Sequence, residues 1–308
     1  MKQHVKPRIS KELYILLLLK RRVDFPAHVY SHYERLQNGY EGELSFYRFM
    51  EENLTVDSIV LYDLLFRYGG STFQIDCLLI CGSKVFLFEV KNFGGDYLIQ
   101  DEDWYSVKTK QEISNPLHQL RRTEHLFRQM LKQITSRFSL ETRLVFVNPN
   151  FFLYHAPLQL PALFPTQIDR YFMELNRGSS VITNFHRDLA DKLVKKHVDE
   201  HPFERIPKYD YEDLKKGIPC LQCDAFMERA NVFYMICPSC QTKEKNEHAI
   251  VRLATEFQTL FPNEPITSSI ISDFSGELFS LYTVRNALQK NFTYYKKGNR
   301  SFFKATES

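Results

Sequence analysis

The sequence predicts a mixed α/β protein in which one large domain is followed by two small modules. Strand-like and helix-like segments are mixed over the first 200 residues, which is typical of α/β or α+β domains. Four cysteines then cluster within residues 220–240, and the remaining segment has the pattern of three helices and a hairpin. We expect an N-terminal helical extension (1–38), a large domain (39–200), a linker with a cysteine module (201–245) and a helical module (246–308).

The overall composition is that of a globular protein. Of the 308 residues, 44% are hydrophobic and 25% are charged, which excludes a mostly disordered or collagen-like chain. The net charge of +3 does not by itself indicate a nucleic-acid partner, so any basic surface must be local. The apolar run after the basic N-terminus is too short for a secretion signal or a membrane span. We therefore expect a reduced, cytoplasmic protein without a membrane partner, and the oligomeric state stays open.

The N-terminal segments predict helices. Three of them are expected over residues 11–22, 28–37 and 41–52. Ser10 is a suitable N-cap for the first. The second is expected to end at Asn38-Gly39, because this dipeptide is a helix-stop signal.

After residue 58 the pattern changes to strands. Apolar or alternating runs occupy residues 59–66, 72–80 and 85–90, with glycine-containing turns between them. Further along the chain we expect helices over 115–134, 166–176 and 184–197, a buried strand over 143–147 and an irregular, proline-rich segment over 151–165.

The hairpin formed by the second and third of these strands is the most informative segment. Gly82-Ser83 suits a two-residue type II′ turn. This register places Asp76 opposite Glu89 and Gln74 opposite Lys91, all on one face of the hairpin. Facing carboxylates in an apolar sheet are unfavourable unless a positive charge lies between them.

Two interpretations of this acidic hairpin remain open on spacing alone. In the first, the carboxylates bind Mg²⁺ through oxygen ligands, and Lys91 beside the ion orients or deprotonates a water or stabilises charge on a phosphate. In the second, an edge hairpin turns its acids toward solvent or pairs them with Lys91. The spacing of the acids is too loose a pattern to decide between the two.

Four blocks in the same order resemble the NERD (nuclease-related) domain of the PD-(D/E)xK nuclease superfamily. They are Gly39-Tyr40-Glu41-Gly42-Glu43, Gln74-Ile75-Asp76, Glu89-Val90-Lys91-Asn92 and Gly95-Asp96. The resemblance covers about residues 11–134 and extends more weakly to about residue 193. It implies a restriction-endonuclease-like fold, with a mixed sheet flanked by helices, and a metal-dependent phosphodiesterase site.

The resemblance also implies roles for single residues. The implied catalytic residues are Glu43, Gln74, Asp76, Glu89, Lys91 and Gln119. Asp76 and Glu89 would bind Mg²⁺ or Mn²⁺, and Lys91 would be the catalytic lysine. Glu43 would be the upstream acid that assists metal binding, unless it only caps or solvates its helix. Gln119 would bind phosphate or water, unless it is only a surface residue.

The four clustered cysteines predict a structural zinc site. Cys220-x-x-Cys223 and Cys237-x-x-Cys240 each point two thiolates at one ion, and four sulfurs suit tetrahedral Zn²⁺. The pattern is similar to a zinc ribbon, which either binds nucleic acid or braces a neighbouring domain. The two remaining cysteines, Cys77 and Cys81, are expected in the core.

Basic residues gather at two places. The helix over 115–134 includes Arg121 and Arg122, which suits either a DNA backbone contact or a solvated helix face. The C-terminal segment resembles a winged helix, or else a helical cap on the zinc ribbon with an incidental basic edge. Its candidate nucleic-acid residues are Arg285, Lys290, Lys296, Lys297 and Arg300.

The sequence therefore favours a metal-dependent nuclease that hydrolyses DNA phosphodiester bonds, with the zinc ribbon and the C-terminal module aiding nucleic-acid binding. One alternative is a catalytically inactive protein with a nuclease fold that binds DNA or has a regulatory role. Another is a subunit that acts only inside a larger nuclease or helicase assembly. The choice between DNA and RNA, and between endo- and exonuclease action, stays open.

Overall fold

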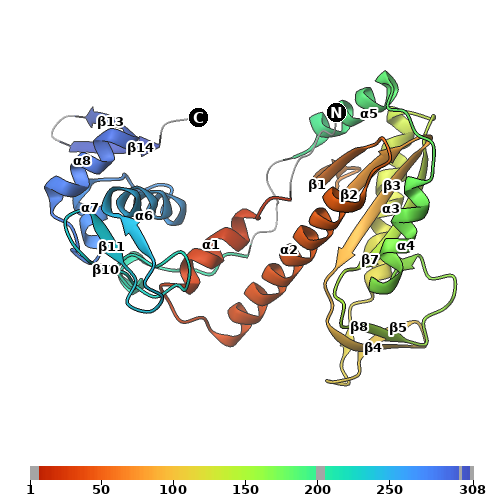
Figure 1. The fold of residues 1–308 in the computed structure, drawn as a ribbon, viewed down its shortest axis with the longest axis horizontal. Helices are drawn as coiled ribbons and strands as arrows, with labels where there is room; N and C mark the ends of the chain where they lie inside the picture. Colours follow the sequence, from red (N-terminus) through yellow and green to blue (C-terminus); the bar gives the residue numbers. More distant parts are fainter. Residues whose placement is uncertain (1–6, 199–204, 298–299, 306–308) are drawn as a thin grey trace. The chain divides into compact units, whose positions relative to one another are not determined.

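A computed structural model describes residues 7–198, 205–297 and 300–305. The chain forms two compact units, each of which is visible in Figure 1. The first comprises Met1–Ile9 and Glu34–Glu204, and the second comprises Ser10–Tyr33 and Arg205–Ser308. The four-part domain division stays a prediction. Among the described helices, none combines the length and the apolar character that a membrane span needs.

The first unit is built on a five-stranded mixed sheet in the order β1-β2-β3-β7-β9. Its strands are β1 (Ile59–Tyr68), β2 (Ser71–Cys81), β3 (Lys84–Lys91), β7 (Ser139–Phe146) and β9 (Ala162–Leu163). The first three are antiparallel, whereas β7 and β9 continue the sheet in parallel. Their apolar runs are buried on both faces, as expected for strands covered on both sides.

Helices cover both faces of this sheet (Figure 1). One face packs against α2 (Ala27–Asn53) and α4 (Pro165–Asn176), and the other against α3 (Pro116–Ile134) and α5 (Asn184–Lys196). On the first face, Phe46 and Phe172 contact Phe88, and on the second Phe127 stacks on Phe66. The predicted fold class, a mixed α/β sheet flanked by helices, is confirmed.

A second, four-stranded sheet has the order β6-β5-β4-β8. Its strands are β4 (Gly95–Gln100), β5 (Asp103–Ser106), β6 (Glu112–Ile113) and β8 (Phe151–Tyr154). The expected irregular segment over 151–165 is wrong at its start, because β8 pairs in parallel with β4 from a distant part of the sequence, whereas residues 155–161 form neither helix nor strand. Side-chain packing also stabilises this strand pairing, because Phe151 stacks on Phe146 with ring centroids 3.9 Å apart.

Helix α2 is continuous, so the predicted stop at Asn38-Gly39 is wrong. Tertiary contacts offset the poor local helix propensity of this dipeptide. The Asn38 side chain donates a hydrogen bond to the Asn92 carbonyl at 2.9 Å, and the Asn92 side chain donates one to the Asn38 carbonyl at 3.0 Å. These two bonds attach the middle of α2 to the residue that follows β3.

The second unit consists of helices, a small sheet and a hairpin. Its helices are α1 (Lys11–Lys20), η1 (Tyr211–Asp213), α6 (Asn246–Leu260), α7 (Ser268–Phe274) and α8 (Leu281–Asn291). Its strands are β10 (Glu228–Arg229), β11 (Tyr234–Ile236), β12 (Lys243–Lys245), β13 (Phe292–Lys297) and β14 (Arg300–Ala305). Ser10 caps α1 by accepting a hydrogen bond from the Leu13 amide, as predicted.

A buried arginine lies in the core of the second unit. Arg22 is 0% exposed, and its Nε donates to Glu256 at 2.6 Å. Its two other guanidinium nitrogens donate to the carbonyls of Lys215 at 2.7 Å and Gly217 at 3.2 Å. The guanidinium also lies 3.9 Å from the centroid of the Phe274 ring. This buried charge is therefore fully paired.

Candidate active site and metal site

The hairpin of β2 and β3 has the predicted two-residue turn, and Gly82 adopts the positive φ of 56° that this turn needs. The backbone ladder follows the predicted register up to Cys77. Beyond it, the predicted pairs of Asp76 with Glu89 and of Gln74 with Lys91 do not form. The Asp76 carboxylate instead accepts a hydrogen bond from the Val90 amide at 2.8 Å. A side chain thus replaces the backbone acceptor and ends the ladder at the acidic residues.

Glu89 and Lys91 form the centre of the site. They are two residues apart on β3, so their side chains lie on the same face of the strand. The Lys91 ammonium donates to Glu89 Oε1 at 2.8 Å and to Gln119 Oε1, on α3, at 3.1 Å. Glu89 is only 1% exposed, and its Oε2 has no hydrogen-bond partner among the described residues. A buried carboxylate oxygen without a partner is costly, and such atoms often mark the place of a ligand.

Glu43 reaches the site because α2 packs closely against the end of β3. A Cβ atom at Gly42 would lie 2.6 Å from the Asn92 Cβ, so only glycine permits this approach. Burial raises the pKa of Glu43 to about 7, and the negative charges of Asp63 and Glu89 add to the shift. The positive charge of Lys91 acts in the opposite direction.

The electrostatics of the site reflect an excess of carboxylates. Burial, and then the charges of Glu89 and Glu43, raise the pKa of Asp76 well above its ordinary value, although Lys91 opposes the shift. Burial lowers the pKa of Lys91, but Glu89 and Asp76 outweigh it, and the net shift is upward. Lys91 is therefore protonated at neutral pH, and its single positive charge faces several acids.

Asp63 is an acidic residue near the site that the sequence analysis missed. It lies in β1 between Tyr62 and Leu64, which pair with Cys77 and Ile75 of β2. Gln74 donates a hydrogen bond to Asp63 Oδ1 at 2.7 Å, so Gln74 contacts this acid and not Lys91 as its predicted register implied. A lone aspartate within the apolar run 59–66 was the available signal.

The donor set at this site suits Mg²⁺ or Mn²⁺, because it consists of carboxylate oxygens and includes the unpartnered Oε2 of Glu89. Outside the cysteine cluster, no three acidic, histidine or cysteine ligand atoms of the described residues lie within 4.8 Å of one another. Mg²⁺ typically takes one or two protein carboxylates and completes its shell with waters and substrate phosphate. The geometry is compatible with such an ion.

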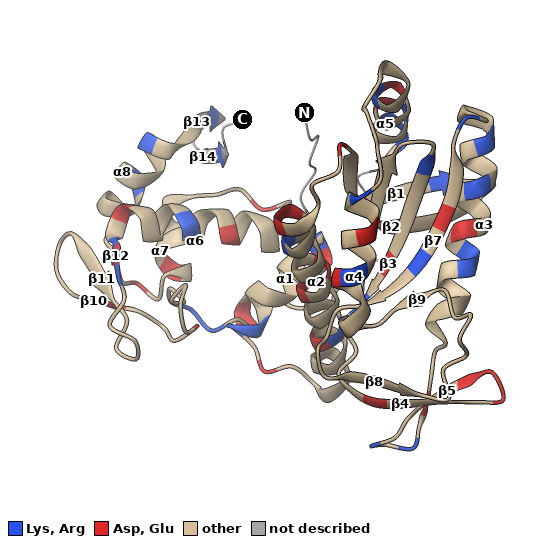
Figure 2. Ribbon diagram, turned by 45° about the vertical axis from the view of Figure 1, so that its right-hand side comes forward, with Lys and Arg blue, Asp and Glu red and all other residues tan. Residues whose placement is uncertain are grey.

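The residues predicted to bind nucleic acid differ in their exposure and in whether their charges are already paired within the protein. Arg121 and Arg122 are exposed on α3, whose basic residues are visible in Figure 2, and Arg122 donates to the Thr72 carbonyl at 3.2 Å. In the second unit Arg285 and Lys296 are exposed. Lys290 forms an ion pair with Glu247 at 3.0 Å. The side chains of Lys297 and Arg300 lie outside the described residues.

The inner face of α8 follows the helical period from its second turn onward. Val284 and Leu288 are buried as the helical period predicts, and Ala287 joins them. Leu281, the first helical residue, is 57% exposed.

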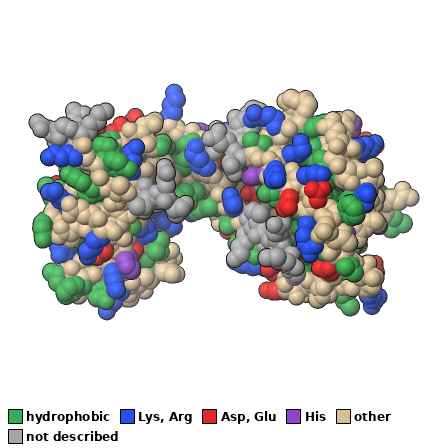
Figure 3. Space-filling model, turned by 90° about the horizontal axis from the view of Figure 1, so that it is seen from above, with side chains coloured by type: hydrophobic (Ala, Val, Ile, Leu, Met, Phe, Trp, Pro, Cys, Tyr) green, Lys and Arg blue, Asp and Glu red, His purple; other side chains and the backbone are tan. Residues whose placement is uncertain are grey.

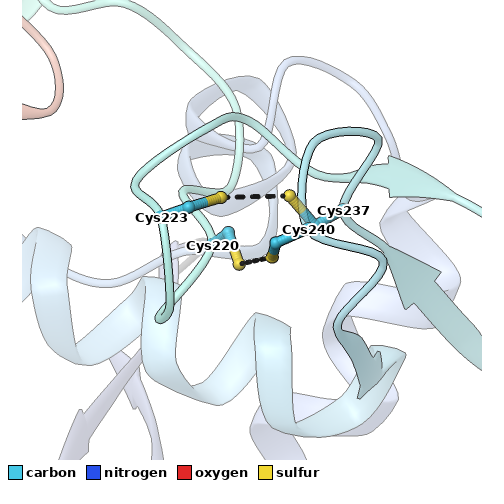
Figure 4. A group of neighbouring side chains, drawn as sticks. All are labelled: Cys220, Cys223, Cys237 and Cys240. Carbon is cyan, nitrogen blue, oxygen red and sulfur yellow. Dashed lines mark hydrogen bonds between the residues drawn. The ribbon is translucent and has the colours of Figure 1, made fainter.

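The four cysteines converge as predicted (Figure 4). The Sγ atoms of Cys220 and Cys240 are 3.6 Å apart, those of Cys223 and Cys237 are 3.4 Å apart, and all four lie within 4.8 Å of one another. Sulfurs bound tetrahedrally at about 2.3 Å from a zinc ion would be about 3.8 Å apart. The cluster is therefore compatible with a closed zinc site beside the β10-β11-β12 sheet. Cys77 and Cys81 are buried, as predicted.

Comparison with known proteins supports the first unit's relationship to nucleases. The family model described as the nuclease-related domain, NERD, matches residues 38–147. No curated protein and no solved structure matches the chain. The matched segment contains the acids of the candidate site, Lys91 and Gln119, and it spans the end of α2, strands β1 to β7 and helix α3. Residues 38–147 are thus a nuclease-related domain, as their sequence blocks predicted.

Proposed function

We propose that this protein is a metal-dependent nuclease that hydrolyses phosphodiester bonds of DNA. The observation that carries the proposal is the state of Glu89 inside the nuclease-related domain. One of its oxygens accepts from Lys91, while the other is buried without a partner among the described residues. A divalent cation at this oxygen would complete the site and offset the crowded carboxylates.

Each residue of the site has a role that its contacts support. Asp76 and Glu89 hold Mg²⁺ or Mn²⁺, and Glu43 adds a carboxylate from α2. The bound ion supplies Lewis-acid activation of water and offsets charge on the phosphate. Lys91, held beside Glu89, would donate a hydrogen bond to a phosphate oxygen or orient the attacking water. Gln119 orients the Lys91 ammonium through its 3.1 Å hydrogen bond.

The proposed contacts to DNA start at the same helix. Gln119 lies in the first turn of α3, and the exposed Arg121 and Arg122 follow it along the chain. Arginines at these positions suit the phosphate backbone on either side of the bond to be cleaved.

We also propose a winged-helix-like module in the second unit. Helices α6, α7 and α8 are followed by the β13-β14 hairpin, and an isolated bridge pairs Ile266 with Phe303 of β14. This order of elements supports the assignment. In such a module Arg285 and Lys296 would contact phosphates. Zn²⁺ at the four cysteines would brace the β10-β11-β12 sheet against α6.

Cleavage of supercoiled plasmid tests the site. With Mg²⁺ present, we expect the wild-type protein to nick or linearise the plasmid, and Asp76→Asn and Lys91→Ala to lose at least about 100-fold in rate. Asp103→Asn, which changes an exposed acid on β5, is the matched control and should cleave as the wild type does. Equal cleavage by wild type and Asp76→Asn would overturn the site.

A DNA-binding protein without catalysis is the second candidate. One observation favours it: among the described residues of the acidic site, no three ligand atoms lie within 4.8 Å of one another. Under this alternative the wild type binds DNA but leaves the plasmid intact with Mg²⁺ and with Mn²⁺. The same plasmid experiment therefore separates the two candidates. A reducing cytoplasmic location is part of either proposal and is supported by the paired C-x-x-C motifs, whose thiolates suit a metal ion.

A further inference from the structure

The second unit contains a groove that the acidic site does not use. It has a volume of about 610 Å³ and lies between the turn before β11, the start of α6 and one side of α8. Phe233 and Tyr282 form part of its lining, and they are 70% and 75% exposed. Large aromatic side chains exposed to this extent on opposite elements of one groove indicate a binding surface. In Figure 3, hydrophobic and basic side chains are interspersed over the visible face of this unit, at the left of the view.

Both aromatic residues are carried by well-fixed backbone. Asn231 Oδ1 accepts hydrogen bonds from the amides of Phe233 at 2.8 Å and Tyr234 at 3.0 Å. The Phe233 carbonyl accepts from the Asn246 amide at 2.9 Å, which attaches this turn to the start of α6. Tyr282 lies in the first turn of α8, whose N-cap is Ser280. The two rings are thus presented at the groove by rigid elements, which lowers the entropic cost of binding.

The polar groups of the groove favour a negatively charged ligand. Lys245 and Lys290 line it, against the single acid Glu247. Glu247 is itself occupied, because it accepts hydrogen bonds from Lys290 at 3.0 Å and Asn291 at 3.4 Å. One positive charge is left over at Lys245, which is exposed. Asn286 adds an amide that can both donate to and accept from a base edge.

We propose that this groove binds single-stranded nucleic acid, with unpaired bases stacked on Phe233 and Tyr282 and the backbone held by Lys245. Exposed aromatic rings combined with a modest positive charge are the chemistry of single-strand binding, since every base has a face that stacks. A continuous duplex keeps its bases paired and offers no such face. The groove volume lies in the range of about 300–1,000 Å³ that is usual for ligand pockets.

The test measures binding to the full-length chain carrying Asp76→Asn, without added Mg²⁺, so that cleavage plays no part. Labelled oligo(dT) and oligo(rU) of about 15 nucleotides distinguish DNA from RNA, and a duplex of the same length is the comparison. We expect Phe233→Ala and Tyr282→Ala each to weaken single-strand binding by about 5–150-fold, the equivalent of about 1–3 kcal/mol per stacked base, with duplex binding unchanged.

Two further variants keep the test specific. Tyr282→Phe retains the ring, so we expect binding within about twofold of the parent, which a loss of folding would not give. Phe152→Ala changes a 54% exposed aromatic residue on β8 of the first unit and should have no effect. Unchanged single-strand binding in both alanine variants, or an equal loss for duplex and single strand, would overturn the proposal.

A spectroscopic reporter gives an independent readout. The chain has a single tryptophan, Trp104, which is 0% exposed in the first unit. Phe233→Trp would add an exposed tryptophan at the groove, and stacked unpaired bases should quench its emission while the duplex does not. If oligonucleotides leave the emission of this tryptophan unchanged while a peptide or protein partner shifts it, the groove does not bind nucleic acid. None of these measurements depends on catalysis at the acidic site, so the two proposals fail separately.

Discussion

Two buried charges in this molecule are paired to very different degrees. Arg22, in the second unit, is 0% exposed, and all its guanidinium nitrogens donate to a carboxylate or a carbonyl. Glu89, in the nuclease-related domain, is 1% exposed, and one of its two oxygens has no partner among the described residues. Both are desolvated and both face an opposite charge, since Glu89 pairs with Lys91 at 2.8 Å, but only the arginine has a hydrogen-bond partner for every nitrogen.

The difference separates a structural charge from a functional one. A buried charge with all its hydrogen bonds fixes the packing around it and needs nothing further. A buried charge with an open position lowers stability until a ligand arrives, and that cost is typical of active sites. The contrast between Arg22 and Glu89 therefore predicts opposite responses to mutation and to metal ions.

Removal of zinc should have the largest effect on the second unit. The four thiolates, like Arg22, form a closed set, so a bound ion contributes to folding directly, up to the about 10–16 kcal/mol seen for structural zinc in small domains. We expect one zinc per chain by elemental analysis, and faster proteolysis between Cys220 and Cys240 after chelation. Cys220→Ser with Cys223→Ser should reproduce the effect. The prediction of structural zinc would be contradicted if the purified protein contained no zinc and if chelation left its resistance to protease unchanged.

Arg22→Met should destabilise the second unit by about 3–5 kcal/mol, because it leaves Glu256 buried without its partner. Urea denaturation measures this loss. Arg21→Met is the matched control: Arg21 pairs at 2.8 Å with Asp224, whose side chain is 50% exposed, so we expect a cost of about 0–1 kcal/mol. Equal losses in the two variants would mean that Arg22 is not the structural charge described above.

Glu89→Gln tests the other side of the comparison. Without divalent ions we expect a stability within about 1 kcal/mol of the wild type, because the variant removes a charge that was only half paired. The rise in melting temperature on adding Mg²⁺ should disappear in this variant. Glu256→Gln, the equivalent change beside Arg22, should instead destabilise the protein strongly. A wild-type response to Mg²⁺ in Glu89→Gln would contradict the proposed ligand.

A pH dependence from Glu43 is the last prediction. Its pKa is raised in the folded state to about 7 from an ordinary value of 4.5, so the folded protein binds more protons than the unfolded chain between these values. The free energy of unfolding should therefore fall as the pH rises through this window, when no divalent ion is present. Glu43→Gln should show a shallower fall. Parallel pH profiles of the two proteins would refute this assignment.

The sequence allowed the two sites to be predicted to different extents. The cysteine site follows from local spacing, because each C-x-x-C turn brings its own two sulfurs together, and the structure brings both pairs within 4.8 Å. The hairpin of β2 and β3 was also local, so its turn and register were predictable. The end of its ladder was not, because the Asp76 side chain competes with the backbone for the Val90 amide.

The remaining errors have long-range causes. Asn38-Gly39 stays helical because hydrogen bonds to Asn92 offset its poor propensity, and no local pattern contains them. Strand β8 forms because it pairs with β4, which lies far away in the sequence. Asp63 was overlooked because a single acid within an apolar run carries no spacing signal.

The backbone of Asp63 limits which mutations can be tolerated at this position. Its φ of 52° lies in the left-handed region, which asparagine and glycine adopt readily and branched residues do not. Aspartate codons are one nucleotide change away from codons for both of these residues, and also from those for valine. Among random variants at this position, we therefore expect those with asparagine or glycine to fold and those with valine to fail to fold. The first two changes remove the negative charge at no backbone cost, so chance mutation can test its contribution directly.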